Sequence, residues 1–558
     1  MLVAGPQQQT SQQRPLGPDA DVCAAEDCHK HGKTLRASIL LVLVCLIPYW
    51  MIPFSHLASD PTTATGFFNY ELPYYVANGR AAFDRGNGFS YPNPYLPDDE
   101  APAIYAHWLL WFMGVAVAAG IDPGDLIFAG TLASSLVFAW ATWCLAGLRV
   151  RNTAGRRTAF AVAMLGGGGL VLGGIVSLIS GEGSVLAHDP SRGLWFLNWG
   201  RNCLFPTEAI YHSLVAGCWI SEIRKRQKTA NVFLILLATT HPWSGVELLL
   251  TVNLFRAINW LRLRDRQSLV ALTASATALG AFLAYYKIWL PSFPTHAALQ
   301  HVWQLNWRVE NLTALLAWGP VFAAALVQII RRWQRLSRSE WFLICAFVTS
   351  SSLSLHDRIM PPVQPLHFTR GYVWMPLFLL GLPIWLIMIE TAWRHMKQRP
   401  VIWRSLAGVI TILLIAADNL TFAAVHVNRQ LQRVDGFHIS SGERTLLQSL
   451  SQPLCRNHVT LTESETLNYL LPTWAPVRPW MGHQFNTPNY ADRKKVWEQC
   501  FTEVQVSAAS VPAEVTQLIV REDTDTEQLP GNWTQIKIRN ADWEIWQRTS
   551  PDSQLTGD

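Results

Sequence analysis

SDPTTATGFFNYELPYYVANGRAAFDRGNGFSYPNPYLPDDEAPAIY, the stretch from Ser59 to Tyr105, separates the first apolar run of the chain from the second. It combines carboxylates, tyrosines and a Gly-Asn-Gly turn, whereas the runs on both sides are apolar enough to form helices in lipid. Such a segment lies at a membrane surface, beside helices that are able to hold a greasy substrate. The pattern favours the site-forming loop of an integral-membrane enzyme over the loop of a simple anchor.

The composition indicates that much of the chain lies in lipid. Of the 558 residues, 50% are hydrophobic and 15% are charged, whereas soluble proteins have about 25% charged residues. We predict an α-helical polytopic membrane protein with about 11 transmembrane helices, a multispanning domain over 38–426 and a C-terminal soluble α/β domain over 427–558. The apolar runs that carry this prediction are 38–54, 104–120, 126–148, 158–180, 203–220, 231–255, 268–290, 311–330, 340–355, 371–391 and 402–425.

Charge and cysteine usage exclude several classes of protein. The net charge is +5, but the Lys and Arg residues fall between the apolar runs, where orientation signals belong, so we expect no nucleic-acid partner. The nine cysteines show no ligand-like clustering, and we expect neither a metal nor a cofactor. Residues 1–37 lack the order of a cleavable signal, which predicts a disordered cytoplasmic tail before a retained first span.

Basic clusters predict which side of the membrane each loop faces. The clusters near Lys33, Arg151, Arg226, Arg264, Arg335 and Lys397 mark the cytoplasmic side. The loops 55–103, 181–202, 291–310 and 356–370 and the C-terminal domain then face outward. This arrangement predicts a protein of the bacterial plasma (inner) membrane with its C-terminal domain outside the cytoplasm.

Two runs do not fit a simple alternation of crossings. Residues 231–255 have basic residues on both sides, and the sequence Thr240-His241-Pro242-Trp243-Ser244-Gly245 predicts a break between two short helices. A full crossing by 104–120 would place the Arg149 to Arg157 cluster outside. Either that run is re-entrant or the charge rule fails there, and the sequence leaves both alternatives open.

The glycine-rich run LGGGGLVLGG, Leu165 to Gly174, resembles a nucleotide-binding loop only superficially. It lies inside an apolar run and lacks the strand, the lysine and the following acid that a phosphate loop needs. Small residues let transmembrane helices approach closely. We therefore interpret the run as a helix-packing surface.

Glu71 is the strongest candidate for acid–base chemistry. It lies in FFNYELPYY, among aromatic residues that are able to shield a carboxylate from water and set its basicity. The alternative is an aromatic belt at the membrane interface with one solvated acid. The other acids of the loop are Asp60, Asp84, Asp98, Asp99 and Glu100.

Three cationic residues lie at the outer ends of apolar segments. His241 in TTHPWSG and Arg370 in HFTRGYVWMPL are ionisable groups at membrane depth, which tend to be functional or paired. Their alternatives are a helix-break histidine bonded to backbone and an arginine that reaches the headgroups. Arg201 precedes Glu208 and His212 at spacings of seven and four, which predicts one helical face. An internal Arg-Glu ion pair is the structural alternative for Arg201.

This layout resembles the GT-C superfamily of polytopic membrane glycosyltransferases. The resemblance covers roughly 38–425 and rests on one span, a long external loop with an acid before tyrosines, and then A-x-x-x-x-G-N-G-F-S-Y. Glu71 with Tyr74 and Tyr75 occupies the position of the family's catalytic base, but the family's Asp-Glu pair is absent. His241 with Gly245, and Arg370 with Tyr372 and Pro376, are similar to later family features, and no WWDYG-like motif occurs.

The resemblance implies an inverting transfer of a sugar from a polyprenyl-phosphate donor to an acceptor hydroxyl. Glu71 is then the base, Arg370, Arg201 and His241 bind the donor phosphate, and Tyr74 and Tyr75 contact substrate. The partners are the donor, the bilayer and an unidentified acceptor. A transporter or flippase of a lipid-linked or small polar substrate is the alternative, because broken helices and intramembrane charges suit translocation. A non-catalytic scaffold is a third reading, and neither rival needs a shielded carboxylate in the first loop.

The last quarter of the chain alternates strand-like and helix-like segments. HVTLT, QLIVRE, WTQIKI and DWEIWQR predict strands, and ESETLNYLL and YADRKKVWEQCF predict helices. The segment Ala475 to Tyr490 is its densest polar and aromatic patch, in which His483 and Asn486 are candidate substrate-binding residues. A plain structural loop is the alternative. Cys455 and Cys500 are able to pair if this face is oxidising.

Overall fold

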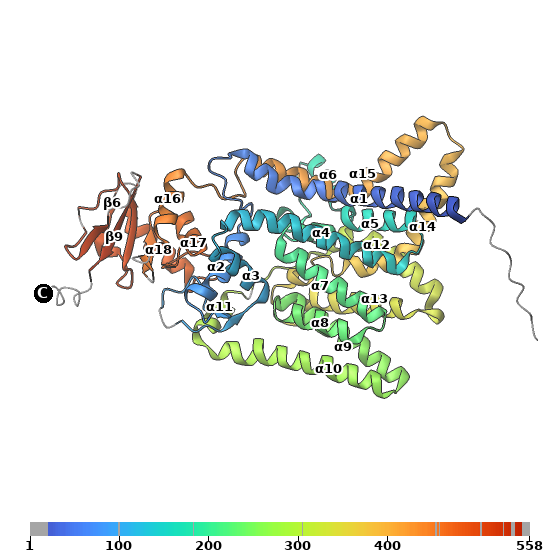
Figure 1. Cartoon of the computed structure of the whole chain (residues 1–558), viewed down its shortest axis with the longest axis horizontal. Coiled ribbons are helices and arrows are strands. Elements are labelled where there is room, and N and C mark those ends of the chain that lie inside the picture. Colours follow the sequence, from blue (N-terminus) through green and yellow to red (C-terminus); the bar gives the residue numbers. More distant parts are fainter. Residues whose placement is uncertain are drawn as a thin grey trace, which may run out of the picture.

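The computed structural model describes residues 20–98, 101–181, 183–303, 305–451, 455–456, 458–502, 505–527, 529–536 and 542–549. Long helices run side by side along the molecule, and a sheet lies at the end that carries the C-terminus (Figure 1). The helices of the body are α1 Ala20–Ser59, α2 Glu71–Asp84, α3 Trp108–Ala118, α4 Pro123–Arg149, α5 Thr153–Leu165, α6 Leu170–Ile179, α7 Pro206–Ile223, α8 Gln227–Ala238, α9 Pro242–Leu263, α10 Arg266–Leu283, α11 Pro294–Val302, α12 Asn311–Arg332, α13 Arg338–Ser354, α14 Trp374–Lys397 and α15 Val401–Leu431.

Six helices of the described part are long and apolar enough to cross a membrane, or seven if α5 and α6, bent by 46°, form one span. They are Leu35–Ser59, Pro123–Arg149, Arg266–Ser292, Asn311–Arg335, Trp374–Lys397 and Val401–Leu431. The polytopic helical class is confirmed, but the predicted number of about 11 spans exceeds this count. The first helix also begins at Ala20, within the tail predicted to be disordered.

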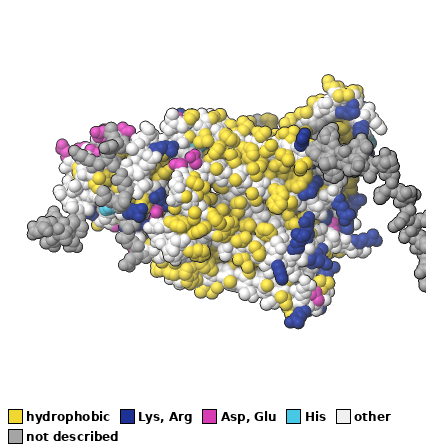
Figure 2. All heavy atoms as spheres, viewed as in Figure 1, with side chains coloured by type: hydrophobic (Ala, Val, Ile, Leu, Met, Phe, Trp, Pro, Cys, Tyr) yellow, Lys and Arg dark blue, Asp and Glu magenta, His cyan; other side chains and the backbone are white. Residues whose placement is uncertain are grey.

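Helices inside the bundle explain part of the difference in number. α7 and α9 bury charged side chains, and Arg256 of α9 donates from Nε to Oε1 of Glu222 of α7 at 3.0 Å. A helix enclosed by other helices has no lipid to face, so it tolerates polar residues that lower its mean hydropathy. Figure 2 shows hydrophobic side chains in a broad band over the body, with Lys and Arg gathered at the end opposite to the sheet.

The ambiguous run 104–120 contains only one helix, the short α3. Its 11 residues span roughly 16 Å, about half of a bilayer core. Before it, β2 (Tyr105–Ala106) pairs with β1 (Ser90–Tyr91) of the first loop. After it, Asp122 caps α4 and accepts a hydrogen bond at 3.2 Å from Trp474, which lies in the C-terminal region. Both ends of α3 therefore lie near the C-terminal region, at one end of the molecule.

Two breaks interrupt apolar runs. The predicted break in 231–255 is confirmed, since α8 ends at Ala238 and α9 begins at Pro242. The run 158–180 was expected to be continuous, but it breaks between α5 and α6, where the Asp418 carboxylate of α15 accepts from the N–H groups of Gly168 and Val171 at 2.7 and 2.9 Å. A Cβ on Gly168 would lie 2.2 Å from the Leu316 carbonyl oxygen, so the glycine is needed for close helix packing.

The C-terminal region contains a mixed sheet in the order β4-β3-β7-β9-β8. β3 pairs in parallel with β4 and β7, and β9 pairs antiparallel with β7 and β8. These elements confirm the predicted strands and helices. Their bounds are α16 Ser441–Ser449, β3 Val459–Thr462, α17 Glu465–Trp474, β4 Arg478–Pro479, α18 Tyr490–Cys500, β5 Phe501–Thr502, β6 Gln505–Val506, β7 Gln517–Arg521, β8 Trp533–Ile536 and β9 Trp543–Arg548.

The C-terminal region packs directly onto the first loop. Arg80 of α2 donates to the Thr473 carbonyl oxygen of α17 at 3.4 Å, and the Thr473 hydroxyl donates to the Pro73 carbonyl oxygen at 3.3 Å. Cys455 and Cys500 do not pair: both are free, buried thiols, and they belong to separate hydrophobic clusters.

Candidate functional site

Glu71 lies at the N-terminus of α2, at the boundary between the helical body and the C-terminal region. Its N–H donates to the Asn69 side-chain oxygen at 3.0 Å, a local turn that starts the helix. The Glu71 side chain is 45% exposed, so its carboxylate is reachable by a substrate. Its position in the first turn of a helix also favours the negative charge.

His483 lies against this carboxylate, with 3.6 Å between its Nε2 and Oε2 of Glu71. The imidazole is only 1% exposed, because four tyrosine rings enclose it at centroid distances of 4.9 to 5.7 Å: Tyr70, Tyr74, Tyr95 and Tyr469. Burial raises the pKa of Tyr70 and of Tyr74 to about 12. These two phenols are therefore neutral at physiological pH.

Asn486 fastens the His483 segment to the first loop. Its side-chain amide lies 3.0 Å from Nδ1 of His483, and its carbonyl oxygen accepts a hydrogen bond from the Asn93 amide at 2.6 Å. The two candidates of the segment 475–490 are thus adjacent to each other, and His483 lies next to Glu71. Both are buried.

Arg370 is presented by a sharp turn before α14. Gly371 has φ +79°, and a Cβ at that position would lie 2.7 Å from the Trp199 Cα, so the turn requires glycine. The Arg370 carbonyl oxygen accepts hydrogen bonds from Asn202 at 3.0 Å and from Nε2 of His212 at 2.7 Å. The backbone that carries the guanidinium is therefore fixed on both sides of the turn.

The guanidinium of Arg370 has one carboxylate partner and one imidazole partner. Nη1 donates to Glu208, and Nη2 donates to Nδ1 of His367 at 2.9 Å. Burial lowers the pKa of His367 to about 3, so its ring is neutral and able to accept. Trp195 lies under the guanidinium at 5.7 Å. The Nε of Arg370 is buried and has no hydrogen-bond partner among the described residues.

Tyr75 connects the two charged groups. Burial and the Glu71 carboxylate together raise the pKa of Tyr75 to about 12, against the opposing effect of the Arg370 guanidinium. Its phenol is thus within the electrostatic reach of both. Tyr75 thus links Glu71 and Arg370 electrostatically, and we refer to these three residues as the charged cluster, although Arg370 lies almost three hundred residues further along the chain.

The structure does not bring Arg201 into this cluster. Its side chain is completely buried, and its guanidinium donates to Asp189 at 2.5 Å, to the Asn419 side chain at 2.8 Å and to the Asp418 carbonyl oxygen at 2.8 Å. Arg201 lies in the 3₁₀ turn Gly200–Cys203, before α7 begins. The expected shared helical face with Glu208 and His212 is therefore wrong, because a turn intervenes, and the buried acidic partner is Asp189.

His241 is the N-cap of α9. Its Nδ1 accepts from the Ser244 N–H at 3.2 Å, and its ring stacks on Tyr211 at 4.6 Å. This is the backbone-bonded helix-break alternative. The neighbouring Trp243 stacks on His367 at 5.0 Å, so the segment reaches the partner of Arg370 through Trp243.

Aromatic residues surround Arg370 that the sequence pattern did not indicate as part of a site. Trp195 and Trp307 approach each other at 5.0 Å, and Trp195 packs against His367 at 4.6 Å. All three are half-buried. Their closeness in sequence to the candidate arginines could have indicated them, since Trp195 precedes Arg201 and His367 precedes Arg370 by only a few residues.

Other acids of the first loop are occupied elsewhere. Asp60 accepts from the Thr62 hydroxyl at 2.7 Å and pairs with Arg433 at 2.9 Å, and Asp84 pairs with Arg80 at 2.6 Å. The Thr62 hydrogen bond is the main cause that lowers the pKa of Asp60 to about 2. Asp99 and Glu100 lie outside the described residues.

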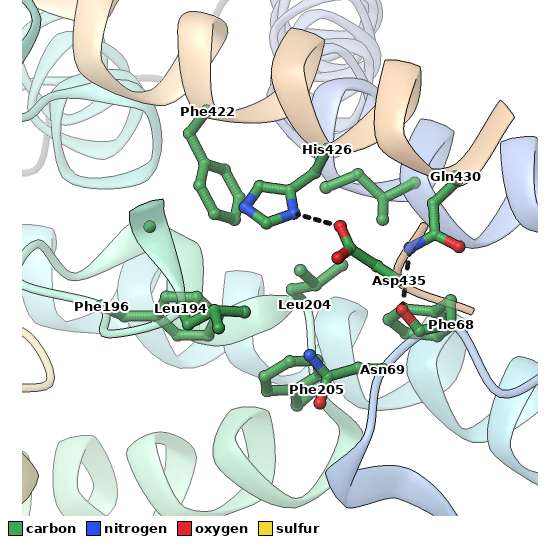
Figure 3. A pocket seen from close by; sticks show the side chains of 12 residues that line it. Phe68, Asn69, Leu194, Phe196, Leu204, Phe205, Phe422, His426, Gln430 and Asp435 are labelled. Carbon is green, nitrogen blue, oxygen red and sulfur yellow. Dashed lines mark hydrogen bonds and ion pairs between the residues drawn. The ribbon is translucent and has the colours of Figure 1, made fainter. Parts of the chain in front are cut away.

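A narrow, largely apolar cleft lies between α1, α15 and the segment before α7 (Figure 3). Leu194, Phe196, Leu204, Phe205 and Phe422 line it, and His426 faces Asp435 at 3.6 Å near its polar edge. Three of the residues that line the cleft are close in sequence to charged residues or to an aromatic neighbour of Arg370. Asn69 precedes Glu71 by two residues, Leu194 precedes Trp195, and Phe205 precedes Glu208 by three.

No protein-family model and no curated protein matches the sequence. Among solved structures, the apo oligosaccharyltransferase of Archaeoglobus fulgidus is similar with a TM-score of 0.51 and 9% identity, over 87% of this chain and 69% of that one. AglB from the same organism, in complex with an inhibitory peptide and a dolichol-phosphate, gives 0.47 at 9% identity over 86% and 69%. ArnT from Cupriavidus metallidurans bound to undecaprenyl phosphate gives 0.42 at 11% identity over 92% and 98%. The first likeness shows that this chain shares its fold with that oligosaccharyltransferase.

Proposed function

We propose that the chain is a membrane glycosyltransferase that moves a sugar from a polyprenyl-phosphate donor to an acceptor hydroxyl with inversion. The observation that carries the proposal is the cluster of a reachable carboxylate, Glu71, and a cation held by its surroundings, Arg370. Transfer of a glycosyl group needs these two charges, a base for the acceptor and a cation for the departing phosphate. The GT-C fold is consistent with this chemistry.

Glu71 accepts the proton of the acceptor hydroxyl as that oxygen attacks the anomeric carbon. The bond between this carbon and the phosphate oxygen breaks, and the electron pair leaves with the polyprenyl phosphate. The new bond forms on the face opposite to the leaving group, so the anomeric configuration inverts. Tyr74, Tyr75 and Asn486 contact substrate in this proposal.

Arg370 binds the donor phosphate and stabilises its developing charge. Its buried Nε–H has no partner among the residues that the structure describes, so this donor is available to a phosphate oxygen. Glu208 and His367 hold the other nitrogens in place. Arg201 and His241, whose hydrogen bonds are made inside the protein, support the fold around the phosphate site in this proposal.

The apolar cleft of Figure 3 receives the first isoprene units of the donor. An isoprenoid chain gains free energy in proportion to the apolar area that it removes from water. The cleft lies between α1, α15 and the segment before α7, next to residues that lead to Glu71 and Arg370. In this proposal the phosphate reaches Arg370 while the chain stays in apolar surroundings.

The basic end of the molecule faces the cytoplasm in this proposal, and the C-terminal domain lies outside, in a bacterial plasma membrane. Lys and Arg gather at the end opposite to the sheet (Figure 2), as cytoplasmic loops do. The division into a membrane domain over 38–426 and an external domain over 427–558 belongs to the same proposal. The reaction then takes place on the external surface.

Labelled polyprenyl-phosphate sugars test the proposal directly. Purified protein in vesicles should release polyprenyl phosphate and label an acceptor, with both products in equal amounts. Movement of intact donor between the two leaflets without any release would contradict the proposal and favour the flippase.

A further inference from the structure

The environment of His483 determines which ring nitrogen carries the proton. Nδ1 accepts a hydrogen bond from the Phe485 N–H at 3.1 Å, and the Asn486 amide lies 3.0 Å from the same atom. A backbone N–H only donates, so Nδ1 has to present its lone pair. The neutral imidazole therefore carries its proton on Nε2.

Nε2 of His483 points at the carboxylate of Glu71. This nitrogen is buried and has no hydrogen-bond partner among the described residues, and Oε2 of Glu71 lies 3.6 Å away. A buried N–H without a partner is costly. A shift of Glu71 by less than 1 Å brings the two atoms into hydrogen-bond distance.

The His483 segment is fixed to the first loop from several sides. The Gln484 N–H donates to the Tyr70 hydroxyl at 3.0 Å, the Tyr469 hydroxyl donates to the Tyr70 carbonyl oxygen, and Asn93 binds the Asn486 carbonyl oxygen. With the tyrosine rings around it, the imidazole has little freedom to turn. A fixed donor is able to select one orientation of the flexible, half-exposed Glu71 side chain.

We propose that His483 is a positioning residue for the base: its Nε2–H holds one oxygen of Glu71, so that the other oxygen faces the acceptor hydroxyl. The inference rests on the proposed function and deepens it. Turnover then depends on the C-terminal domain being docked on the first loop, because His483 comes from the segment between α17 and α18. His483 was predicted from the sequence to bind substrate, and the geometry points instead to an indirect role through Glu71.

Three replacements of His483 separate this role from a structural one. Gln places an amide N–H near the position of Nε2–H, Asn places it near Nδ1, and Phe keeps the ring shape without any donor. We expect His483→Gln to keep kcat within about threefold of wild type. His483→Asn and His483→Phe should lose roughly tenfold to a hundredfold in kcat, the loss of one hydrogen bond to a charged group. The KM for the donor should stay unchanged in all three.

The pH dependence of kcat provides a second readout. A hydrogen bond from Nε2–H favours the charged carboxylate, so the acidic limb of the profile should move to higher pH in His483→Phe and stay in place in His483→Gln. The other groups that act on Glu71 are the same in both variants; they are Arg370, Tyr70, Tyr74, Tyr75, Tyr95 and Tyr469. A purely structural defect would not move the limb in one variant alone.

Several outcomes would overturn the inference. Equal loss in His483→Gln and His483→Phe would show that the ring, and not the Nε2 donor, matters. A rise in KM with unchanged kcat would return His483 to substrate binding. If His483→Phe does not fold, the comparison of Gln with Asn decides. If His483→Asn keeps wild-type turnover while Glu71→Gln is inactive, the role of His483 is refuted but the proposed base stands. If Glu71→Gln is active, the proposed base itself is refuted.

Discussion

Arg370 and Glu208 form a buried ion pair that joins the turn before α14 to the first turn of α7. The Glu208 side chain is only 3% exposed and that of Arg370 is 14% exposed. Removing one partner of such a pair leaves the other charge buried without compensation, which costs about 3 to 5 kcal/mol. The pair therefore has a structural role in addition to the phosphate-binding role that we propose for Arg370.

A double-mutant cycle separates these two roles. Arg370→Ala should lower the free energy of unfolding by about 3 kcal/mol and weaken donor binding, because the phosphate loses its cation. The double variant with Glu208→Ala should recover most of the stability, since no charge is left unpaired, but none of the donor affinity. Thermal unfolding in detergent and binding of labelled donor give the two quantities.

Recovery of donor affinity in the double variant would contradict this account, because Arg370 would then serve only the fold. Arg394→Ala is the matched control. Arg394 pairs with Glu390 at 2.5 Å, but both side chains are more than half exposed. Loss of such a pair should cost less than about 1 kcal/mol and leave donor binding intact.

Filling the apolar cleft should affect donors according to their chain length. Leu194→Trp adds bulk at a residue that lines the cleft and is 47% exposed. We expect the KM for a long polyprenyl donor to rise about tenfold, the equivalent of 1.4 kcal/mol, and the KM for a donor with a very short chain to change little. Ile359→Trp, at an 87% exposed position outside the cleft, is the control. An equal rise for both donors would place the chain elsewhere.

The orientation of the chain is open to cysteine labelling. Single cysteines at Gln484 and Phe89, both exposed near the sheet end, should react in intact cells with a reagent that does not cross membranes. Cysteines at Arg226 and Arg335, exposed at the basic end, should react only after permeabilisation, because Lys and Arg mark cytoplasmic loops. The reverse pattern would overturn the external placement of the C-terminal domain.

Asp435 should make the stability of the protein depend on pH. Burial raises its pKa, but hydrogen bonds and charges of His426 and Arg429 outweigh this and lower the pKa to about 2. A depressed carboxyl pKa stabilises the folded state above the unfolded value of about 3.9, and this contribution is lost as pH falls toward 2. Asp435→Asn should cost about 1 to 2 kcal/mol at pH 7, with the difference shrinking between about pH 5 and pH 2. A constant difference across this range would refute the linkage.

The first loop and the C-terminal strands could be predicted from the sequence because their sequence patterns are local. FFNYELPYY marked Glu71, and short alternating runs marked β3, β7 and β9. The contact between Glu71 and His483 could not be predicted from the sequence, since it joins residues more than four hundred positions apart. The assignment of Arg201 to the phosphate failed to anticipate Asp189 and Asn419, which neutralise and bind its guanidinium from distant segments.

Among the described residues, fewer helices than the predicted number of about 11 are long and apolar enough to count as spans, and the reason is physical. An apolar run indicates that a segment is removed from water. Its hydropathy does not show whether the segment is buried inside the protein or in lipid. The short helix α3 packs at one end of the molecule, and the partly polar α7 and α9 are enclosed by other helices. The break between α5 and α6 depends on a carboxylate from α15, which no local pattern reveals.

The most direct test of the central claim is the rate of sugar transfer by Glu71→Gln. Gln keeps the shape of the side chain and removes the basic lone pair, so transfer from labelled polyprenyl-phosphate sugar should fall about a hundredfold or more. Donor binding and thermal stability should stay near those of wild type, because the Glu71 side chain is half-exposed. Wild-type transfer by Glu71→Gln would contradict the account, and loss of transfer only in Asp60 or Asp98 variants would move the base to another acid of the same loop.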